Sequence, residues 1–369
     1  MMQFIDLNKQ QQNVKESLDR RIQDVLNHGQ YIHGPEVKEL EEKLANFTNR
    51  KHAIAVANGS DALVLALMAL EIGEGDAVFT PSFTFFASAS CVPQVGATPV
   101  FVDIEKSSFN IDPKHLEKQI QKVIAEGKLK PKAIIAVDLF GLMANYEKLQ
   151  SIAKKYDLYL IEDAAQSFGA SQNGKKSCSY GVIATTSFFP AKPLGCYGDG
   201  GMIFTDDDKL NEMIRSLSVH GKGSDKYDNV RIGRNSRLDT LQAAILLAKF
   251  EVLEEEINKR QEVAKYYTER LKEYLLTPLI PMNNVSAWAQ YTLRSGNRDG
   301  IMKSLNKAGI PSVIYYPKPL HLQTAFNYLK IESLPVTEKL VSEVFSIPFH
   351  PYMEKDEQDL VIKTILSDL

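Results

Sequence analysis

Short apolar segments alternate with helical patterns through most of this chain, and that alternation is what most limits how it can fold. The apolar segments lie at 52–58, 77–82, 98–104, 132–141, 158–164, 185–189 and 201–206. Strands rich in Val, Ile and Phe that alternate with helices form a mostly parallel sheet covered on both faces. We therefore predict an α/β fold with a seven-stranded sheet, in which ligands bind at the carboxyl ends of the strands.

Helical patterns flank this alternating region on both sides. Residues 12–28 and a stretch that begins at Pro35 each carry one apolar face, and a long helical pattern runs from Ser236 to about Leu275. Beyond it we expect strands at 287–295 and 312–316 and helices near 298–308 and 354–367. We predict a large α/β domain over 1–250, with an N-terminal helical segment at 1–50, and a smaller C-terminal α+β domain over 251–369.

Composition and charge argue against several kinds of partner. The net charge is −3 and no dense Lys/Arg block occurs, which disfavours nucleic acid and anionic membranes. No apolar signal core and no run of about 18 apolar residues is present. The three cysteines have no metal-type spacing and an odd count, which favours a reducing compartment, and no histidines pair at ligand spacing. We expect a cytoplasmic protein without a metal.

One lysine lies in an irregular loop after a predicted strand. Lys192 stands in SFFPAKPLGCYGDGG (187–201), between two prolines and ahead of four glycines. Proline fixes φ and glycine permits positive φ, so we predict a rigid loop. Apolar neighbours would take the amine out of water, lower its pKa and allow it to form a Schiff base with a carbonyl. The plain alternative is a solvated surface lysine, which is the more common state.

A second candidate lies where the first predicted strand meets its helix, at Asn58-Gly59-Ser60-Asp61. The first amides of a helix have no internal partner and can bind an anion such as phosphate. Gly59 permits close approach, and Ser60 offers a hydroxyl. Ser187, five residues before Lys192, is a further possible phosphate donor. The structural alternatives are a helix N-cap at Ser60 or Asp61 and an ordinary strand hydroxyl at Ser187.

Two carboxylates, Glu162 and Asp163, end the predicted strand at 158–164. A buried carboxylate needs a partner, and a protonated pyridine nitrogen would provide one while making the ring an electron sink. A helix cap or an ion pair is the alternative. Strand alternation puts the two side chains on opposite faces, and the sequence leaves open which one faces a ligand. Phe85 follows another strand end and could stack on a planar cofactor, although core packing is more common.

Asn235 and Arg237, in the stretch GRNSRLD, precede the long helical pattern. The arginine could bind a carboxylate or a phosphate, and a capping asparagine with a surface arginine is the alternative. His220, Tyr315 and Tyr316 lie near the expected domain edges and are weak candidates singly. Taken together, a phosphate cradle, a stacking ring, a carboxylate and a reactive lysine are the groups that bind and use pyridoxal 5′-phosphate (PLP).

Over nearly its whole length the chain resembles the PLP-dependent nucleotide-sugar aminotransferases of fold type I. The resemblance rests on NGSDAL (58–63), PSFTFFAS (81–88), EDAAQSFGA (162–170), the Lys192 loop and NSRLDTLQAAIL (235–246). It implies that Lys192 binds the cofactor covalently and shuttles a proton, whereas relatives with histidine there are dehydratases. The other implied cofactor contacts are Asp163 at the ring nitrogen, Gln166 at the ring hydroxyl, Phe85 on the ring face, and Gly59, Ser60, Ser187 and the neighbouring subunit's Asn235 at the phosphate.

Within this family the likeness is greatest to aminotransferases acting on UDP-2-acetamido-2-deoxy-3-keto-glucuronate. GQYIHGPEV, CYGDGG, NSRLDTLQAAIL and PFHPY carry it. It implies a homodimer with shared active sites, L-glutamate as amino donor, a role in surface-polysaccharide synthesis, and Arg237 as partner of the sugar carboxylate. This chain has Tyr315 where that group tends to have histidine. The alternatives are an aminotransferase for a dTDP-linked 3-keto- or 4-keto-6-deoxyhexose and a non-catalytic PLP-binding regulator.

Overall fold

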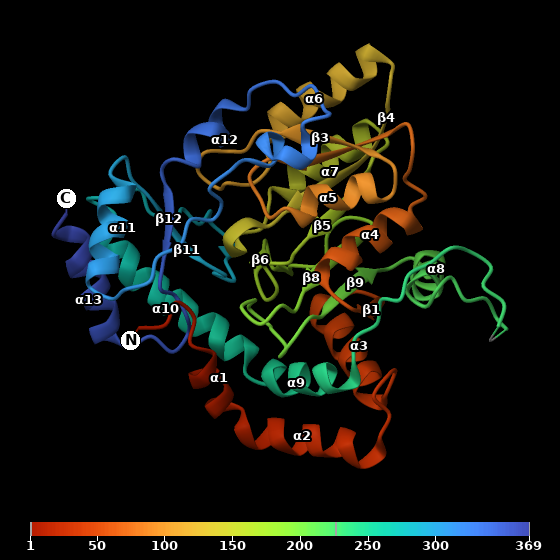
Figure 1. Cartoon of the computed structure of the whole chain (residues 1–369), viewed down its shortest axis with the longest axis horizontal. Coiled ribbons are helices and arrows are strands. Elements are labelled where there is room, and N and C mark those ends of the chain that lie inside the picture. Colours follow the sequence, from red (N-terminus) through yellow and green to blue (C-terminus); the bar gives the residue numbers. More distant parts are fainter. Residues whose placement is uncertain (1, 226, 369) are drawn as a thin grey trace.

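Seven strands form the central sheet of the computed structural model, which describes residues 2–225 and 227–368 (Figure 1). Their order is β1-β9-β8-β5-β4-β2-β3. The neighbouring strands are parallel except for β9, which runs antiparallel to both β1 and β8. The predicted mostly parallel α/β sheet is therefore confirmed. The strands are β1 (His52–Val56), β2 (Asp76–Pro81), β3 (Thr98–Val102), β4 (Lys130–Val137), β5 (Tyr159–Asp163), β8 (Ile183–Ser187) and β9 (Gly201–Thr205).

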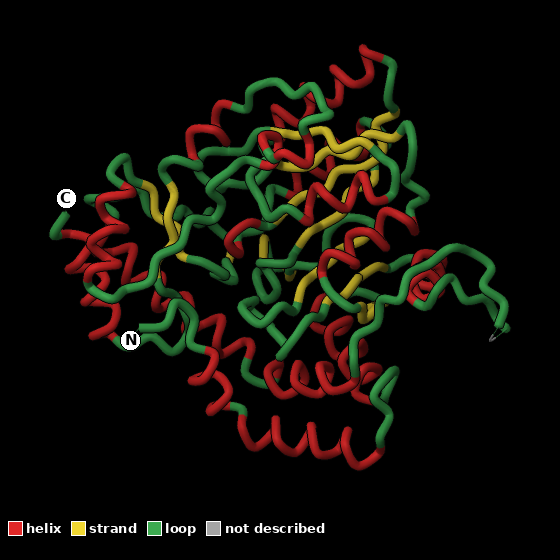
Figure 2. Tube along the Cα trace, in the orientation of Figure 1, coloured by secondary structure: helices red, strands yellow, loops and turns green. Residues whose placement is uncertain are grey.

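Helices cover both faces of this sheet, with the strands between them (Figure 2). Side chains alternate along β1, so that Ala53 and Ala55 enter one core while Ile54 and Val56 enter the other. Both faces are apolar because neither meets water. One face packs against α3 (Pro35–Thr48), α6 (Pro113–Glu126), α7 (Tyr146–Lys155) and α9 (Thr240–Phe250), and the other against α4 (Gly59–Ala69), α5 (Ala87–Gln94) and α8 (Asp208–Ser218).

The C-terminal part of the chain builds a further core of its own. Helix α10 (Leu253–Leu271) joins this C-terminal core to the central sheet. Leu253 and Ile257 pack in the core between the sheet and α9, whereas Val263 and Leu271 pack in the C-terminal core. The predicted domain division at 250/251 stays a prediction. The other members of this core come from β11 (Tyr291–Arg294), β12 (Val344–Ile347), α11 (Arg298–Lys307) and α13 (Lys355–Leu366).

The remaining elements are short or peripheral. Helix α2 (Lys15–His28) lies along α9 and is preceded by α1 (Leu7–Asn13) (Figure 1). Helix α12 (Pro335–Leu340) and three single turns, η1 (Leu139–Gly141), η2 (Leu320–Leu322) and η3 (Thr324–Phe326), lie in connecting segments. A small sheet joins β6 (Ser171–Gln172), β7 (Lys175–Lys176) and β10 (Asn284–Val285). Within the described ranges, no helix is long and apolar enough to cross a membrane.

The predicted long helix from Ser236 to Leu275 is wrong in one respect. Two helices occupy this range, and the chain turns between Phe250 and Leu253. Val252 has φ −110° and ψ 0°, away from helical values, so the two helices can pack in different cores. Neither Gly nor Pro stands at the break. The sequence pattern therefore looks helical on both sides of the break, and no residue there indicates that the helix ends.

The two strands predicted in the C-terminal part are shorter than expected. Only Tyr291–Arg294 of the predicted 287–295 strand pairs, because the amides of Ala287 and Ala289 donate instead to carbonyls of the 140–141 turn. The predicted strand at 312–316 is a single bridge between Val313 and Ser346. The actual partner of β11 is β12, which the sequence analysis did not predict.

Arg50 fixes the turn that leads into β8. Its guanidinium donates to the carbonyls of Cys178 (3.0 Å), Tyr180 (2.6 Å) and Gly181 (2.9 Å), and it pairs with Asp206 at 2.7 Å. The arginine is buried, so water could not readily replace it as the hydrogen-bond donor to these carbonyls. Arg50 therefore stabilises the strand that ends at the candidate residue Ser187.

We expect Arg50→Met to lower the free energy of unfolding by about 3 kcal/mol, because buried carbonyls would be left without donors. Urea unfolding followed by circular dichroism measures this change. Lys51→Met is the matched control, since Lys51 makes an exposed ion pair with Asp208, and it should cost under about 1 kcal/mol. Equal losses for the two variants would contradict the role given to Arg50.

Candidate active site

A cavity of about 390 Å³ lies at the carboxyl ends of the parallel strands. It is bounded below by the residues that follow β1, β5 and β8 and on one side by Tyr315 and Tyr316. Most of the residues singled out from the sequence line it. These are Gly59, Ser60, Phe85, Asp163, Gln166, Ser187, Lys192, Tyr315 and Tyr316.

Three other candidates, His220, Asn235 and Arg237, are not among the residues that line this cavity. Val219 pairs with Asn235, and the His220 amide donates to the Arg234 carbonyl, so the segment after α8 forms a ladder with itself. The middle of this segment projects from the body of the protein at the right of Figure 1, whereas its end returns to the sheet, where Ser236 accepts from the Ala57 amide at 3.2 Å. None of the three side chains lines the Lys192 cavity of its own chain, and their roles stay predictions.

The loop that carries Lys192 is closed at both ends by backbone hydrogen bonds. The Phe188 amide donates to the Gly200 carbonyl, and the Cys196 amide donates to the Phe188 carbonyl, each at 2.8 Å. The Lys192 amide donates to the Phe189 carbonyl at 2.9 Å. A Cβ at Gly195 would stand only 2.5 Å from the Pro190 carbonyl oxygen. These bonds close the loop, and its rigidity stays a prediction. None of its four glycines has a positive φ, and Gly195 is instead required by close approach of the backbone.

Two opposing effects set the acidity of the lysine. Removal from water lowers the pKa of Lys192 to about 8, and the carboxylate of Asp163 opposes part of that shift. Loss of hydration outweighs the attraction, so far more free amine exists near neutral pH than for an exposed lysine. The free amine is the nucleophile that attacks a carbonyl. Lys192 is half-buried in the cavity wall, so the fully solvated surface state does not describe this side chain.

Asp163, rather than Glu162, faces the cavity. Its carboxylate accepts hydrogen bonds from the Ser88 hydroxyl (2.8 Å) and the Ala165 amide (3.2 Å). Burial raises the pKa of Asp163, while the nearby ammonium of Lys192 opposes that rise. Glu162 points to the other side of β5, where it accepts from the amides that begin the 178–181 turn. A cationic ring nitrogen in the cavity would therefore meet Asp163.

The start of α4 has the shape of an anion cradle. Asn58 is its N-cap and accepts from the Asp61 amide at 2.8 Å, so the alternative of a cap at Ser60 or Asp61 does not hold. Ser60 is left exposed at the cavity. A Cβ at Gly59 would stand 2.7 Å from the Ser187 Cβ, so only glycine lets the two strand ends approach. The free first amides and two hydroxyls suit a phosphate group.

Aromatic and amide side chains complete the walls. Phe85 is 55% exposed and its ring centroid lies 6.3 Å from that of Tyr316, whereas Phe83 takes the core position instead. Gln166 accepts from the Phe140 amide at 2.6 Å and donates to the Tyr316 hydroxyl at 3.2 Å. An exposed ring beside a buried carboxylate and a lysine can stack on a planar cofactor.

Sequence reasoning missed several residues of this site. Ser88 holds the Asp163 carboxylate, but a serine in a helix of small residues gives no signal of that contact. Gln290 reaches the cavity from the C-terminal part of the chain, and Asp199 and Phe189 come from the Lys192 loop.

Among the residues that the structure describes, no group of three or more His, Cys, Asp or Glu could hold a metal ion.

These residues fit PLP. The cradle at Gly59 leaves no space for a Cβ, the buried Asp163 needs a positive partner, and Lys192 presents a reactive amine. Fold and site together define a PLP-dependent aminotransferase of fold type I. The sequence model of the DegT/DnrJ/EryC1/StrS aminotransferase family matches residues 12–366, and the chain belongs to this family.

Known proteins agree with this assignment. The chain is 51% identical over 355 residues, 96% of each chain, to the UDP-2-acetamido-2-deoxy-3-oxo-D-glucuronate aminotransferase of Pseudomonas aeruginosa. A DegT DnrJ EryC1 StrS aminotransferase from Brucella abortus superposes with a TM-score of 0.98 at 51% identity, covering 100% of this chain and 99% of that one. The ntda protein of Bacillus subtilis, solved with bound cofactor PMP, gives 0.89 at 30% identity, covering 99% and 82%.

We expect Asp163→Asn to lower the pKa of Lys192 further below about 8, because the carboxylate that favours the ammonium would be gone. The pH dependence of Lys192 acetylation by acetic anhydride in cofactor-free enzyme, read by mass spectrometry, reports this pKa. Asp199→Asn removes another carboxylate from the same cavity and serves as the control. A midpoint that rises in Asp163→Asn would contradict the electrostatic account.

Proposed function

We propose that this enzyme transfers an amino group from L-glutamate to UDP-2-acetamido-2-deoxy-3-keto-glucuronate, producing a 3-amino sugar. The observation that carries the proposal is the 51% identity with the Pseudomonas aeruginosa enzyme over 96% of both chains. A cavity built around a reactive lysine agrees with it. The product would enter surface-polysaccharide (O-antigen or capsule) synthesis in the cytoplasm.

In this mechanism the protein side chains divide the work. The bound cofactor supplies an electron sink for negative charge at the reacting substrate carbon. Lys192 Nζ, the amine among the described residues that line the cavity, moves the proton to and from that carbon. Asp163 holds the positive ring nitrogen, and Ser60, Ser187 and the first amides of α4 hold the phosphate. Gln166 binds the ring hydroxyl.

Charge in the cavity supports a site shared between two subunits. Its lining carries Lys192 as a cation and both Asp163 and Asp199 as carboxyl groups. A UDP-linked uronate brings a diphosphate and a carboxylate, so cationic groups must come from elsewhere. We propose that Arg237, together with Asn235, enters the cavity of a second copy in a homodimer.

The projecting segment after α8 has the surface expected of such a contact. Ile232 is 89% exposed and Val230 is 53% exposed, although both side chains are apolar. Exposed apolar side chains beside cationic ones are typical of a protein interface. His220 lies on the same segment, and we propose that it borders the shared site.

We expect Arg237→Met to raise KM for the 3-keto uronate tenfold to a hundredfold, corresponding to roughly 1.5–3 kcal/mol for a lost charged hydrogen bond. A coupled assay with this sugar and L-glutamate measures it. A dTDP-linked keto-6-deoxyhexose has no carboxylate. Its turnover should therefore be poor, and it should be the same in wild type and in Arg237→Met. Arg231→Met, whose guanidinium already bonds Ser216, is the control. Preferred turnover of the deoxyhexose would establish the alternative substrate class.

A mixture of two defective variants tests the shared site. Lys192→Ala and Arg237→Met should each be nearly inactive at low substrate concentration. In a refolded equimolar mixture, half of the dimers are hybrids with one site that has both residues intact. We therefore expect recovery to about a quarter of wild-type activity. No recovery, with hybrids shown by mass spectrometry, would mean that Arg237 does not act across the interface.

A further inference from the structure

Two walls of the cavity come from distant parts of the chain. Phe85 follows β2, whereas Tyr316 precedes the segment 317–340, which contains η2, η3 and α12. The two ring centroids lie 6.3 Å apart, and the Tyr316 ring lies 6.4 Å from that of the buried Phe83. The position of the 317–340 segment therefore controls the space beside Phe85.

A chain of buried hydrogen bonds ties this segment to the end of β2. The Ser82 carbonyl accepts from the Leu320 amide at 2.9 Å, and Ser82 Oγ lies 2.6 Å from His321 Nδ1. His321 Nε2 lies 3.1 Å from Glu338 Oε1 on α12. Ser82 is fully buried and His321 is 6% exposed, so water does not compete for the bond between them, whereas 36% of the Glu338 side chain is exposed.

The partners determine which imidazole nitrogen carries the hydrogen. The Glu338 carboxylate can only accept, so Nε2 carries the ring hydrogen and donates to it. In the neutral ring Nδ1 then accepts from the Ser82 hydroxyl, whose oxygen also accepts from the His321 amide at 3.2 Å. Glu338 accepts in addition from the Leu334 amide at 2.8 Å. Burial lowers the pKa of His321 and favours this neutral form, although the Glu338 carboxylate opposes the shift.

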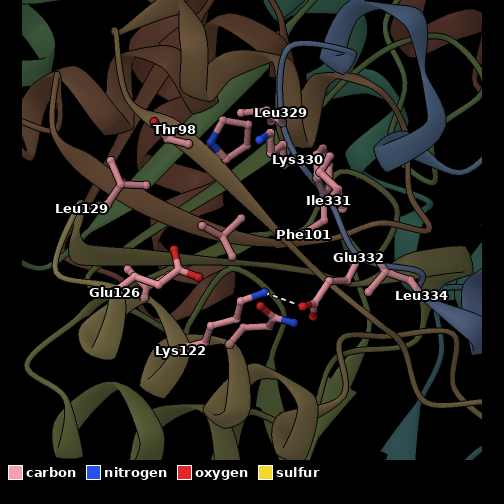
Figure 3. Close-up of a pocket in the computed structure, with 14 residues that line it drawn as sticks. Thr98, Phe101, Lys122, Glu126, Leu129, Leu329, Lys330, Ile331, Glu332 and Leu334 are labelled. Atoms are coloured by element: carbon pink, nitrogen blue, oxygen red, sulfur yellow. Dashed lines mark ion pairs between the residues drawn. The ribbon is translucent and has the colours of Figure 1, made fainter.

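Other contacts hold the segment independently. Asp103, just past β3, accepts from the amides of Val336 and Thr337 and from the Thr337 hydroxyl. On the outer side, residues 329–334 border a groove of about 160 Å³ against β3 and α6 (Figure 3). There Lys122 and Glu332 form an ion pair at 2.8 Å, with 40% and 65% of their side chains exposed. Loss of the buried chain would thus shift the segment without releasing it.

We propose that Ser82 and His321, whose ring is oriented by Glu338, are positioning residues that set the gap between Phe85 and Tyr316. Ser82 stands three residues before Phe85, and His321 stands five residues after Tyr316, so their bond joins both walls near the ring. Ser88, whose hydroxyl holds Asp163, follows on the same stretch. The inference rests on the proposed stacking of the cofactor ring on Phe85. None of Ser82, His321 and Glu338 is among the residues that line the cavity.

The holoenzyme itself provides the test, through the visible circular dichroism of bound PLP and the PLP dissociation constant. Ser82→Ala and His321→Gln remove the bond at Nδ1, and we expect each to weaken PLP binding about tenfold and to halve the dichroic band per bound PLP. His321→Asn places an amide where Nδ1 stood and should stay within about twofold of wild type. Lys122→Gln breaks the exposed ion pair and should change neither quantity.

Thermal unfolding of each variant separates positioning from plain stability. If Ser82→Ala and His321→Gln lower Tm yet keep wild-type PLP affinity and dichroism, the proposal is overturned. If Ser82→Ala does not fold, His321→Gln is compared with His321→Asn. Equal losses of PLP affinity and of dichroism in these two variants would overturn the proposal. PLP affinity and dichroism are both measured without the sugar substrate.

The proposed function fails in a different way. A wild-type protein that shows no PLP band would contradict it.

Discussion

The electrostatic attraction between a lysine withdrawn from water and a buried carboxylate is the interaction on which this site depends. Loss of water lowers the pKa of Lys192 to about 8, and Asp163 restrains that shift without cancelling it. Asp163 ends β5, and Lys192 lies in the closed loop that follows the adjacent strand β8, so strand pairing and loop hydrogen bonds together bring them to one cavity. Each charge alone would be costly to bury, and a positive cofactor ring would relieve the carboxylate.

Hydrogen-bonded backbone around the cavity keeps these groups in place. The Lys192 loop is closed by its own hydrogen bonds, Gly59 lets the start of α4 lie close to the end of β8, and Asn58 caps α4. Preorganised donors and charges do not need to rearrange when a ligand binds, which is the main way in which protein groups favour a reaction. The fold thus supplies the floor, while Tyr315 and Tyr316 form a wall attached through Ser82 and His321.

Much of this could be predicted from the sequence because the strand ends bring the relevant residues together. The alternating apolar segments predicted the sheet. Because Gly59, Asp163 and Lys192 all follow or end its strands, the sheet also predicted that they lie at one edge. Contacts between distant segments left no such signal. The turn at Val252 has neither Gly nor Pro, and the partner of β11 lies some fifty residues away. Arg237 does not reach the cavity of its own chain, which a sequence pattern cannot reveal.

Reduction of the holoenzyme with borohydride tests the central claim most directly, because it fixes PLP permanently to the amine that holds it. Lys249 is a fair competitor, since its side chain is buried and burial lowers its pKa to about 8 as well. Peptide mass spectrometry then identifies the modified residue. The account predicts a single labelled peptide that carries PLP on Lys192. Labelling of Lys249, or of no lysine in an enzyme that still transaminates, would contradict it.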